Sequence, residues 1–328
     1  MTRSLTSIDD EFQRAADSYR AELLAHCYRM LGSVHEAEDL VQETYLNAWR
    51  GYPAFEGRSS LRTWLYRIAT NACLTALEGR ERRPLPIGLG AQSSDPEVAP
   101  VEQAEVPWLE PIPDALLDPA SVVTSRESVR LAFIAALQHL PPRQRAVLVL
   151  RDVLKWRAAE VAEMLGTTTA AVNSALQRAH AQISAAAPTR DAVAEPTTAQ
   201  QRDLLDRFVV AFEAKDIDAI VEVFTQDAVL EMPPFPGWYR GPRDIARLVA
   251  NWCPAGTGDL RLVPIAGNGQ PGFATYIRAS AIDTAAGQSG SFVPWKLELL
   301  ELAATGVRHS TSFFDTRLFA VFGLPDSL

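Results

Sequence analysis

The 328-residue sequence predicts a multidomain protein in which two all-α domains precede one α+β domain. Apolar residues recur at helical spacing through residues 1–83 and 126–187, and a proline-rich, acidic stretch at 84–125 separates these two regions. Over residues 198–328, helices give way to a run of strand-like segments, which is the order typical of α+β folds. The composition, 47% hydrophobic and 22% charged, is that of a globular protein.

Several classes of protein are disfavoured by what the sequence lacks. No apolar run reaches about 18 residues, and the N-terminus MTRSLTSIDDEF has no signal-peptide core, so we expect a cytoplasmic protein. Cys27, Cys73 and Cys253 lie far apart without a paired motif, which favours structural burial over metal binding. We therefore expect no metal and no cofactor.

The first helical domain covers residues 1–83. Apolar stripes through 19–50 predict two helices, and LGSVHE forms the turn between them. After GYPAFEGR, Ser59 or Ser60 can cap a third helix, SLRTWLYRIATNACLTAL. We expect a compact bundle of about 80 residues.

Residues 84–125 contain 8 prolines, 7 acidic residues and neither lysine nor arginine. Proline at this density prevents long helices, and like charges extend the chain, so we interpret the stretch as a linker. A small folded subdomain is the alternative, although few residues are available to seed its core: Trp108, Leu109, Leu116 and Leu117.

The second helical domain, residues 126–187, contains the pattern of a helix-turn-helix. Thr124 and Glu127 have capping-box spacing just before its first helix, and a second helix begins near Pro141–Pro142. Ala162, Gly166 and Val172 then have the spacing that this motif requires, although a helical hairpin in an ordinary bundle is the alternative. Residues 126–190 hold 9 basic and 4 acidic side chains, so this segment suits DNA even though the chain has a net charge of −9. The expected DNA-facing residues of the second helix are Thr168, Thr169, Asn173, Ser174, Gln177, Arg178 and His180.

A second linker at 188–197 leads into the α+β domain. Helices are expected over 200–214, 218–225 and 242–252, together with a strand at AVLEM. Four further strands are expected at DLRLVPIA, GFATYIRAS, SFVPWKLELLEL and VRHSTSFFD, and they predict a curved antiparallel sheet.

The two helical domains together resemble a known family. AEDLVQETYLNAW and FEGRSSLRTWLYRIATNACL resemble region 2 of the sigma-70 family, specifically its extracytoplasmic-function group, and LPPRQRAVLVLRDVLKWRAAEVAEMLGTTTAAVNSALQRA resembles region 4. Both motifs occur in the family's order, over roughly residues 18–183. The resemblance implies a sigma factor, which has no catalytic site of its own. Its implied partners are core RNA polymerase and promoter DNA, with no membrane contact.

The same resemblance implies roles for particular residues of region 2. Polymerase binding maps onto Asp39, Leu40, Gln42 and Glu43. The loop at Phe55–Ser60 corresponds to the one that receives an unpaired base of the −10 element. Aromatic rings among cations suit single-stranded DNA, and Trp64 and Tyr66 are the candidate rings, with core packing as the alternative for either one. The expected −10 contacts are Phe55, Arg58, Ser59, Arg62, Trp64, Arg67, Asn71, Arg80, Arg82 and Arg83.

Two further expectations follow for the linker and the recognition helix. In this family the connection between regions 2 and 4 threads the polymerase channel used by RNA, and an acidic linker without cations can imitate a nucleic-acid backbone there. A solvated tether is the alternative. The recognition helix has fewer arginines than related factors, which predicts weaker salt dependence and leaves the −35 sequence open.

The C-terminal domain resembles SnoaL-like domains, an α+β cone related to polyketide cyclases and ketosteroid isomerases. The resemblance rests on QRDLLDRFVVAFEAKDIDAIVEVFTQDAVLEMPP and WYRGP, and it implies internal control in place of a separate anti-sigma factor. A ligand pocket, a docking surface for protein and a catalytic site remain open as its role. A ligand-sensing one-component regulator and a cyclase- or isomerase-like enzyme are the alternative functions of the whole chain. The candidate polar pocket residues are Asp227, Tyr239, Asp259, Arg261 and His309, and the expected lining aromatics are Trp238, Trp252, Phe235, Trp295 and Phe313.

Overall fold

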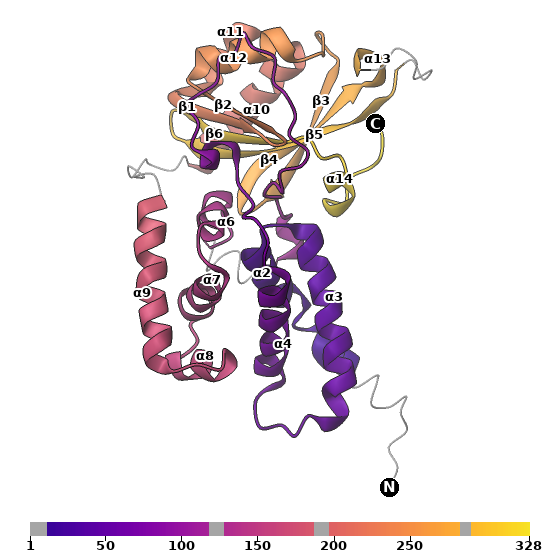
Figure 1. Cartoon of the computed structure of the whole chain (residues 1–328). Coiled ribbons are helices and arrows are strands. Elements are labelled where there is room, and N and C mark those ends of the chain that lie inside the picture. Colours follow the sequence, from indigo (N-terminus) through magenta and orange to yellow (C-terminus); the bar gives the residue numbers. More distant parts are fainter. Residues whose placement is uncertain (1–11, 118–127, 187–196, 283–289) are drawn as a thin grey trace. The chain divides into compact units, whose positions relative to one another are not determined.

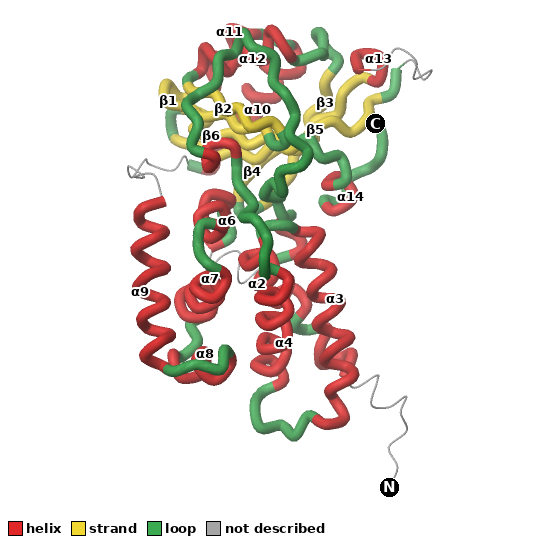
Figure 2. The backbone as a smooth tube through the Cα atoms, viewed as in Figure 1, coloured by secondary structure: helices red, strands yellow, loops and turns green. Residues whose placement is uncertain are grey.

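The computed structural model describes residues 12–117, 128–186, 197–282 and 290–328. The chain forms two compact units, each assembled from two separate stretches of sequence (Figures 1 and 2). A helical unit comprises residues 1–83 and 109–188, and an α+β unit comprises residues 84–108 and 189–328. The expected multidomain fold, with two all-α regions and a C-terminal α+β domain, is confirmed. The expected capping box at Thr124 and Glu127 lies outside the described residues.

The N-terminal part of the helical unit contains the helices α2 (Arg20–Leu31), α3 (Val34–Gly51) and α4 (Leu61–Ala76), with a short 3-10 turn η1 (Tyr52–Ala54) before α4. Ser60, one of the two serines expected to cap the third helix, does cap α4, and Ser33 caps α3 in the same way. Ser33 Oγ accepts a hydrogen bond from the Glu36 amide, and Ser60 Oγ accepts one from the Thr63 amide. Gly32 ends α2 in the left-handed region, with φ of 71°.

The C-terminal part of the helical unit contains η3 (Asp114–Leu116), α6 (Leu131–Gln138), α7 (Pro142–Leu148), the π-helical turn η5 (Val149–Val153), α8 (Ala158–Met164) and α9 (Thr169–Ala186). Arg145 joins this part to the N-terminal bundle, because its buried guanidinium donates to the Met30 carbonyl oxygen as well as to Gln138 Oε1 at 2.8 Å. Burial lowers the pKa of Arg145 to about 10, which still leaves the side chain charged at neutral pH.

The α+β unit begins with α10 (Thr198–Ala214) and α11 (Ile217–Val223), followed by β1 (Phe224–Met232), β2 (Phe235–Arg240) and α12 (Pro242–Trp252). The rest of the unit comprises β3 (Leu260–Gly267), β4 (Gln270–Arg278), α13 (Ala279–Ile282), β5 (Phe292–Ala303), β6 (Gly306–Phe313) and α14 (Leu318–Val321). The six strands form one sheet in the order β2-β1-β6-β5-β4-β3. Its apolar core lies between the sheet and the helices α10, α11 and α12 (Figure 1).

Two details of the sheet differ from the sequence prediction. The sheet is mixed, because β1 and β6 pair in parallel while every other neighbouring pair is antiparallel. No hairpin joins β1 to β6, so no tight turn sets their relative direction. Strand β2 was not predicted, since Pro236 and Gly237 interrupt its pattern. It forms the edge of the sheet, where a proline costs no ladder hydrogen bond.

The predicted linker divides between the two units. Residues 84–108, here called the strap, belong to the α+β unit and include only one short turn, η2 (Pro86–Leu89), so that most of the strap is drawn as loop in Figure 2. Ser94 donates its amide hydrogen to the Trp238 carbonyl at 2.7 Å, and Gln103 donates to the Pro234 carbonyl at 2.9 Å. A proline-rich chain cannot build its own core, but its main-chain groups can bond to a neighbouring surface.

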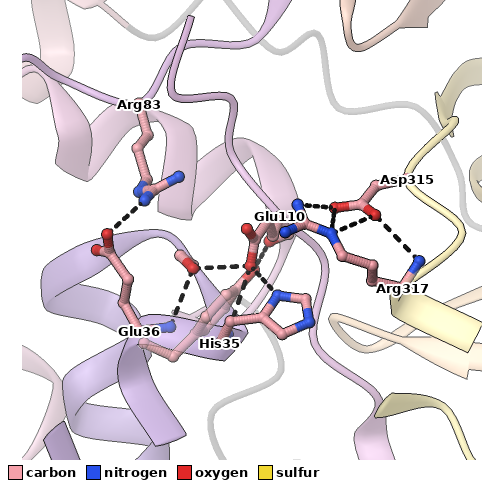
Figure 3. Close-up of polar contacts among 8 residues, drawn as sticks. His35, Glu36, Arg83, Glu110, Asp315 and Arg317 are labelled. Carbon is pink, nitrogen blue, oxygen red and sulfur yellow. Dashed lines mark hydrogen bonds and ion pairs between the residues drawn. The ribbon is translucent and has the colours of Figure 1, made fainter. Parts of the chain in front are cut away.

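After the strap, the chain joins the helical unit at Glu110, which binds the turn between α2 and α3. The Glu110 amide donates to the Gly32 carbonyl at 2.9 Å, and Ser33 Oγ donates to Glu110 Oε2 at 2.7 Å. His35 Nδ1 lies 3.0 Å from the same carboxylate oxygen (Figure 3). Burial by itself would raise the pKa of Glu110, but the hydrogen bonds from His35 and Ser33 outweigh it and hold the pKa below its ordinary value.

This lowered pKa predicts a pH-dependent contribution to stability. A carboxyl whose pKa is lower in the folded state stabilises the fold above its unfolded pKa of about 4.3, and that contribution is lost as the pH falls through the folded-state pKa. We expect Glu110→Gln to reduce the free energy of unfolding by about 1–3 kcal/mol at neutral pH, and by less in acid. Urea denaturation followed by circular dichroism measures this. Glu81→Gln, at an exposed position, is the control, and an equal loss at both pH values would contradict the prediction.

Candidate functional site

One face of α3 presents an uninterrupted row of exposed side chains. Asp39, Gln42 and Glu43 are all exposed, while Leu40 is half-buried. Leu46 and Trp49 extend the row and are 55% and 49% exposed, although they are large and apolar. The opposite face carries the buried residues Val34, Ala37, Val41, Thr44 and Ala48. The side chains at 39, 42, 43 and 46 share a face because they are three, four and seven positions apart. Acidic groups next to exposed apolar ones are suited to binding a basic, partly apolar partner.

The loop before α4 contains a stack of aromatic rings. The ring centroids of Phe55 and Trp64 lie 4.8 Å apart, and those of Tyr52 and Phe55 lie 6.2 Å apart, both pairs being stacked. Phe55 and Trp64 are half-buried, so each ring still offers surface to solvent. Arg58 belongs to the same loop, has 87% of its side chain exposed and forms an ion pair with the exposed Glu56. A preformed ring stack with a solvated cation in the same loop has the chemistry that unpaired bases require.

The remaining predicted cations of region 2 already have acidic or basic neighbours. Arg62 forms a bidentate contact with Glu22, at 2.6 to 3.1 Å, and lies over the ring of Tyr66. Tyr66 is fully buried and bonds to Glu22, so its ring is part of the core and not a stacking platform. Arg67 pairs with Glu163 of α8 at 2.9 Å.

The arginines after α4 do not form the free cationic cluster that the sequence indicates. Arg80 and Arg83 share the carboxylate of Glu36 at 2.7 and 2.8 Å, and Arg82 contacts His139 at 2.7 Å (Figure 3 shows Arg83 with Glu36). Burial, together with the nearby charges of Arg82 and Arg145, lowers the pKa of His139. Two other residues predicted to contact −10 DNA lie away from these arginines: Asn71 is exposed on α4, and Ser59 is half-buried in the loop.

Helices α8 and α9 form a helix-turn-helix with the predicted register. Val161, Ala162 and Val172 are buried at the contact, and Gly166 makes the turn with φ of 61°. Thr168 Oγ1 accepts a hydrogen bond from the Ala171 amide and thereby caps α9. The seven predicted DNA-facing residues are all exposed: Thr168, Thr169, Asn173, Ser174, Gln177, Arg178 and His180.

Besides Thr168, three of these seven residues have hydrogen-bond partners within the unit: Ser174, Arg178 and His180. Arg178 donates to Ser174 Oγ at 2.8 Å, and His180 Nε2 bonds to Asp152 of η5. Asn173 and Gln177 lie one helical turn apart, since they are separated by four positions, and so they share the outward face. Their amide groups are therefore the principal base-reading candidates on α9.

The α+β unit encloses a cavity of about 270 Å³ between the sheet and α12. Three of the predicted lining aromatics do line it, namely Phe235, Trp252 and Trp295, whereas Phe313 does not. The other candidates also lie elsewhere: Asp227, Trp238, Tyr239, Asp259, Arg261 and His309. Asp227 is exposed and accepts a hydrogen bond from Thr225, Asp259 pairs with Arg278, and Arg261 lies over the ring of Phe292. Trp238 contacts the strap, Tyr239 is buried in the core, and His309 bonds to Glu231.

The period of two along a strand explains this error. On β1, Leu230 and Met232 face the cavity, so Glu231 and the other odd-numbered residues of β1 point to the opposite face. His309 of β6 pairs with Val229 of β1, so its side chain belongs to that opposite face as well. A polar side chain on the face of the sheet that points away from the cavity cannot reach the pocket, whatever its chemistry.

The polar groups that do line the cavity were missed in the sequence. They are Thr275 on β4 and the pair Lys296 and Glu298 on β5, whose charged atoms lie 3.0 Å apart. The available signal was the alternation in KLEL, which places the charged side chains of Lys296 and Glu298 on one face of the strand between apolar neighbours.

An exposed acidic and apolar helix face, a ring-stacked loop and a capped helix-turn-helix, followed by an α+β domain, together have the features of a promoter-recognition factor. Residues 15–83 match Sigma-70 region 2, residues 130–183 match Sigma-70 region 4, and residues 205–295 match the SnoaL-like domain. The chain is 56% identical over 323 residues to the ECF RNA polymerase sigma factor SigG of Mycobacterium tuberculosis, covering 97% of this chain and 85% of that protein. The chain belongs to the extracytoplasmic-function sigma factors of the sigma-70 family. It is therefore not an enzyme.

One solved structure that spans nearly the whole chain has this fold. The crystal structure of the Mycobacterium tuberculosis extracytoplasmic function sigma factor SigJ matches with a TM-score of 0.62 at 23% identity, over 95% of this chain and 99% of that one. A Bartonella quintana sigma factor RpoE in complex with the anti-sigma factor NepR matches over 54% of this chain and 96% of that one, at 22% identity and a TM-score of 0.36. The expectation that no separate anti-sigma factor acts on this chain stays a prediction. Among the described residues, no helix is long and apolar enough to cross a membrane.

Proposed function

We propose that this sigma factor binds core RNA polymerase in the cytoplasm through the exposed face of α3, captures unpaired −10 DNA at the loop before α4, and reads −35 duplex with α9. The observation that carries this proposal is that all three surfaces are exposed in one helical unit, each with the chemistry that its partner requires. The α3 face is acidic and apolar, the loop offers stacked rings together with Arg58, and α9 offers amides at Asn173 and Gln177.

Promoter capture requires the Arg67–Glu163 ion pair to open. Glu163 is 76% exposed and Arg67 is 36% exposed, so the pair is largely solvated. Exposed pairs of this kind contribute about 1 kcal/mol or less, which a DNA phosphate readily replaces. Arg62 differs, because Glu22 holds it with three hydrogen bonds against Tyr66. We assign Arg58 and Arg67 to DNA contact and Arg62 to holding α4 in place.

The general test is transcription of bacterial genomic DNA in vitro with purified core polymerase and the full-length chain, followed by sequencing of RNA 5′ ends. We expect a set of start sites that share −35 and −10 sequences and that are absent without the chain. Start sites that do not depend on the chain would overturn the proposal.

The same assay tests the recognition helix. We expect the double variant Asn173→Ala/Gln177→Ala to reduce transcription from these promoters by about tenfold or more, because a bidentate amide–base contact is worth about 1–3 kcal/mol. Gln182→Ala, at an exposed position elsewhere on α9, is the matched control and should retain full output. A double variant that transcribes from the same start sites at normal strength would remove these two residues from promoter reading.

We further propose that docking of the strap on the SnoaL-like domain keeps the factor inactive. In the sigma-70 family, the connection between regions 2 and 4 threads the polymerase channel, and the strap is most of that connection in this chain. In the docked state, main-chain groups of Ser94 and Gln103 are bonded to the cone, and the Pro96 carbonyl accepts a hydrogen bond from Trp252 Nε1 at 2.9 Å. The same groups cannot bond to the cone and lie in the channel at once, so polymerase binding and strap docking compete.

A further inference from the structure

The cavity of the SnoaL-like domain has a wall that belongs to the strap. Its lining is almost entirely apolar and comes from α10, α12 and the sheet, with Pro100 of the strap also contributing. Representative lining residues are Phe212, Leu230, Ile245, Leu248, Leu262 and Trp295. A volume of about 270 Å³ exceeds the roughly 150 Å³ that holds a benzene molecule, so one ring with a short chain fits.

One part of the cavity lining is polar, and its charges are already balanced. Lys296 Nζ lies 3.0 Å from Glu298 Oε2 and donates to Ser312 Oγ at 3.1 Å. Glu298 Oε1 accepts hydrogen bonds from the hydroxyls of Ser310 and Ser312. Glu298 is thus fully engaged, whereas these contacts use two of the three ammonium hydrogens of Lys296.

Thr275 is the unsatisfied member of this polar set. Its side chain is 1% exposed and lines the cavity, yet its Oγ1 has no hydrogen-bond partner within the described chain. Thr275 and Lys296 are direct cross-strand partners on β4 and β5, so their side chains stand next to each other on the cavity face. A buried hydroxyl without a partner is costly, and a ligand oxygen at this place would satisfy it together with the remaining ammonium hydrogen.

We propose that the cavity binds a neutral, mostly apolar molecule of about one ring and a short chain, whose single carbonyl oxygen accepts hydrogen bonds from Thr275 Oγ1 and Lys296 Nζ. An anionic ligand is disfavoured because Glu298 already balances the charge of Lys296, and a second carboxylate would be buried beside the first. A pure hydrocarbon fits the walls but leaves Thr275 unpaired. Because Pro100 is part of the wall, an occupied cavity holds the strap in its docked position.

Calorimetric titration of the full-length chain tests the ligand class without polymerase, so its outcome is independent of the proposed role of the strap in transcription. The probes are 4-phenyl-2-butanone, butylbenzene and 4-phenylbutanoate, which share one ring and differ in their polar group. We expect the ketone to bind about tenfold more tightly than either of the others, as one satisfied buried hydroxyl predicts. Absence of binding by any probe, equal binding of ketone and hydrocarbon, or tightest binding of the carboxylate would each overturn the proposal.

Three single-residue variants test where the probes bind. Thr275→Val keeps the side-chain volume and removes a buried unpaired hydroxyl, so the fold is retained; we expect it to abolish the preference for the ketone while leaving butylbenzene unchanged. Leu262→Trp fills the cavity and should abolish binding of all three probes. Thr305→Val, at an exposed turn, is the matched control and should behave as wild type. A ketone preference that survives Thr275→Val would place the carbonyl elsewhere and refute the assignment.

Hydrogen exchange measures whether a ligand in the cavity stabilises the docked strap. We expect the ketone to slow exchange of the Ser94 and Gln103 amides, both of which donate to carbonyls of the cone. Amides of α9, which belongs to the other unit, serve as the internal reference. Unchanged exchange at both strap amides, with the ketone bound, would show that the cavity closes without the strap and would refute that part of the proposal.

Discussion

Reversing the charge of Asp39 and Glu43 together, by Asp39→Arg/Glu43→Arg, is expected to weaken binding to core RNA polymerase by about 100-fold or more. Both side chains are exposed on α3, next to Gln42 and Leu46, and neither supports the fold of the helical unit. Like charges placed across an interface cost several kcal/mol, because repulsion replaces attraction at both positions. Biolayer interferometry with immobilised core polymerase measures the affinity directly.

The control for this prediction carries a matched charge change on the same unit. Glu78→Arg and Glu81→Arg lie at exposed positions beyond the end of α4, so together they change the net charge equally without touching the α3 face. Affinity should stay near the wild-type value in that control. If the two double variants lose affinity equally, the loss reflects overall charge and not a specific surface. If neither loses affinity, α3 does not hold the polymerase.

Replacing Glu231 by alanine is expected to free the start of the strap and to raise promoter-dependent transcription several-fold. Glu231 is fully buried, accepts a hydrogen bond from the Ile87 amide at 2.8 Å and bonds to His309 at 2.6 Å. Loss of a buried carboxylate leaves the Ile87 amide without its acceptor, at a cost of about 1–3 kcal/mol to the docked state only. A shift of that size changes the equilibrium constant between the undocked and docked strap by about 5- to 150-fold.

Proteolysis reports strap release separately from transcription. The strap contains neither lysine nor arginine, so trypsin leaves it intact, but a glutamate-specific protease can cut after Glu97, Glu102 and Glu105, which are exposed. We expect faster cleavage at these sites in Glu231→Ala and wild-type rates in Glu222→Ala, an exposed acidic position on α11. Faster cleavage with unchanged transcription would mean that docking does not control activity. Unchanged cleavage would mean that Glu231 does not anchor the strap.

Helical and strand periodicity predicted most secondary structure because it depends on local spacing. The helix over 242–252 and the turn at Gly166 have their expected form, and Ser60 is the capping residue of the two serines that the sequence left open. The exposure of the α9 residues follows from the same helical spacing. Their assignment to the −35 element, like that of Asp39 and its neighbours to polymerase, stays a prediction.

Ion pairs between residues far apart in sequence could not be predicted from local spacing. Four cations stand in a pattern that suits DNA, but each has a carboxylate partner that lies 40 to 96 positions away in sequence: Arg62, Arg67, Arg80 and Arg83. Nothing in local spacing indicates which distant acid meets which arginine. Strand β2 was missed because proline is tolerated only where a strand lies at the sheet edge, and the edge is a property of the whole sheet.

The amino-acid sequence alone determined the order of the modules, the register of the helix-turn-helix and the family, because each of these depends on residues near one another in the chain. Only the tertiary structure decided that residues 84–108 dock on the cone and that Thr275, Lys296 and Glu298 meet at one cavity. The physical reason is that a strap of proline and acidic residues bonds through its main chain, whose partners no side-chain pattern reveals. A cavity likewise depends on how several strands pair and on which face of the sheet each side chain occupies, and the whole fold determines both.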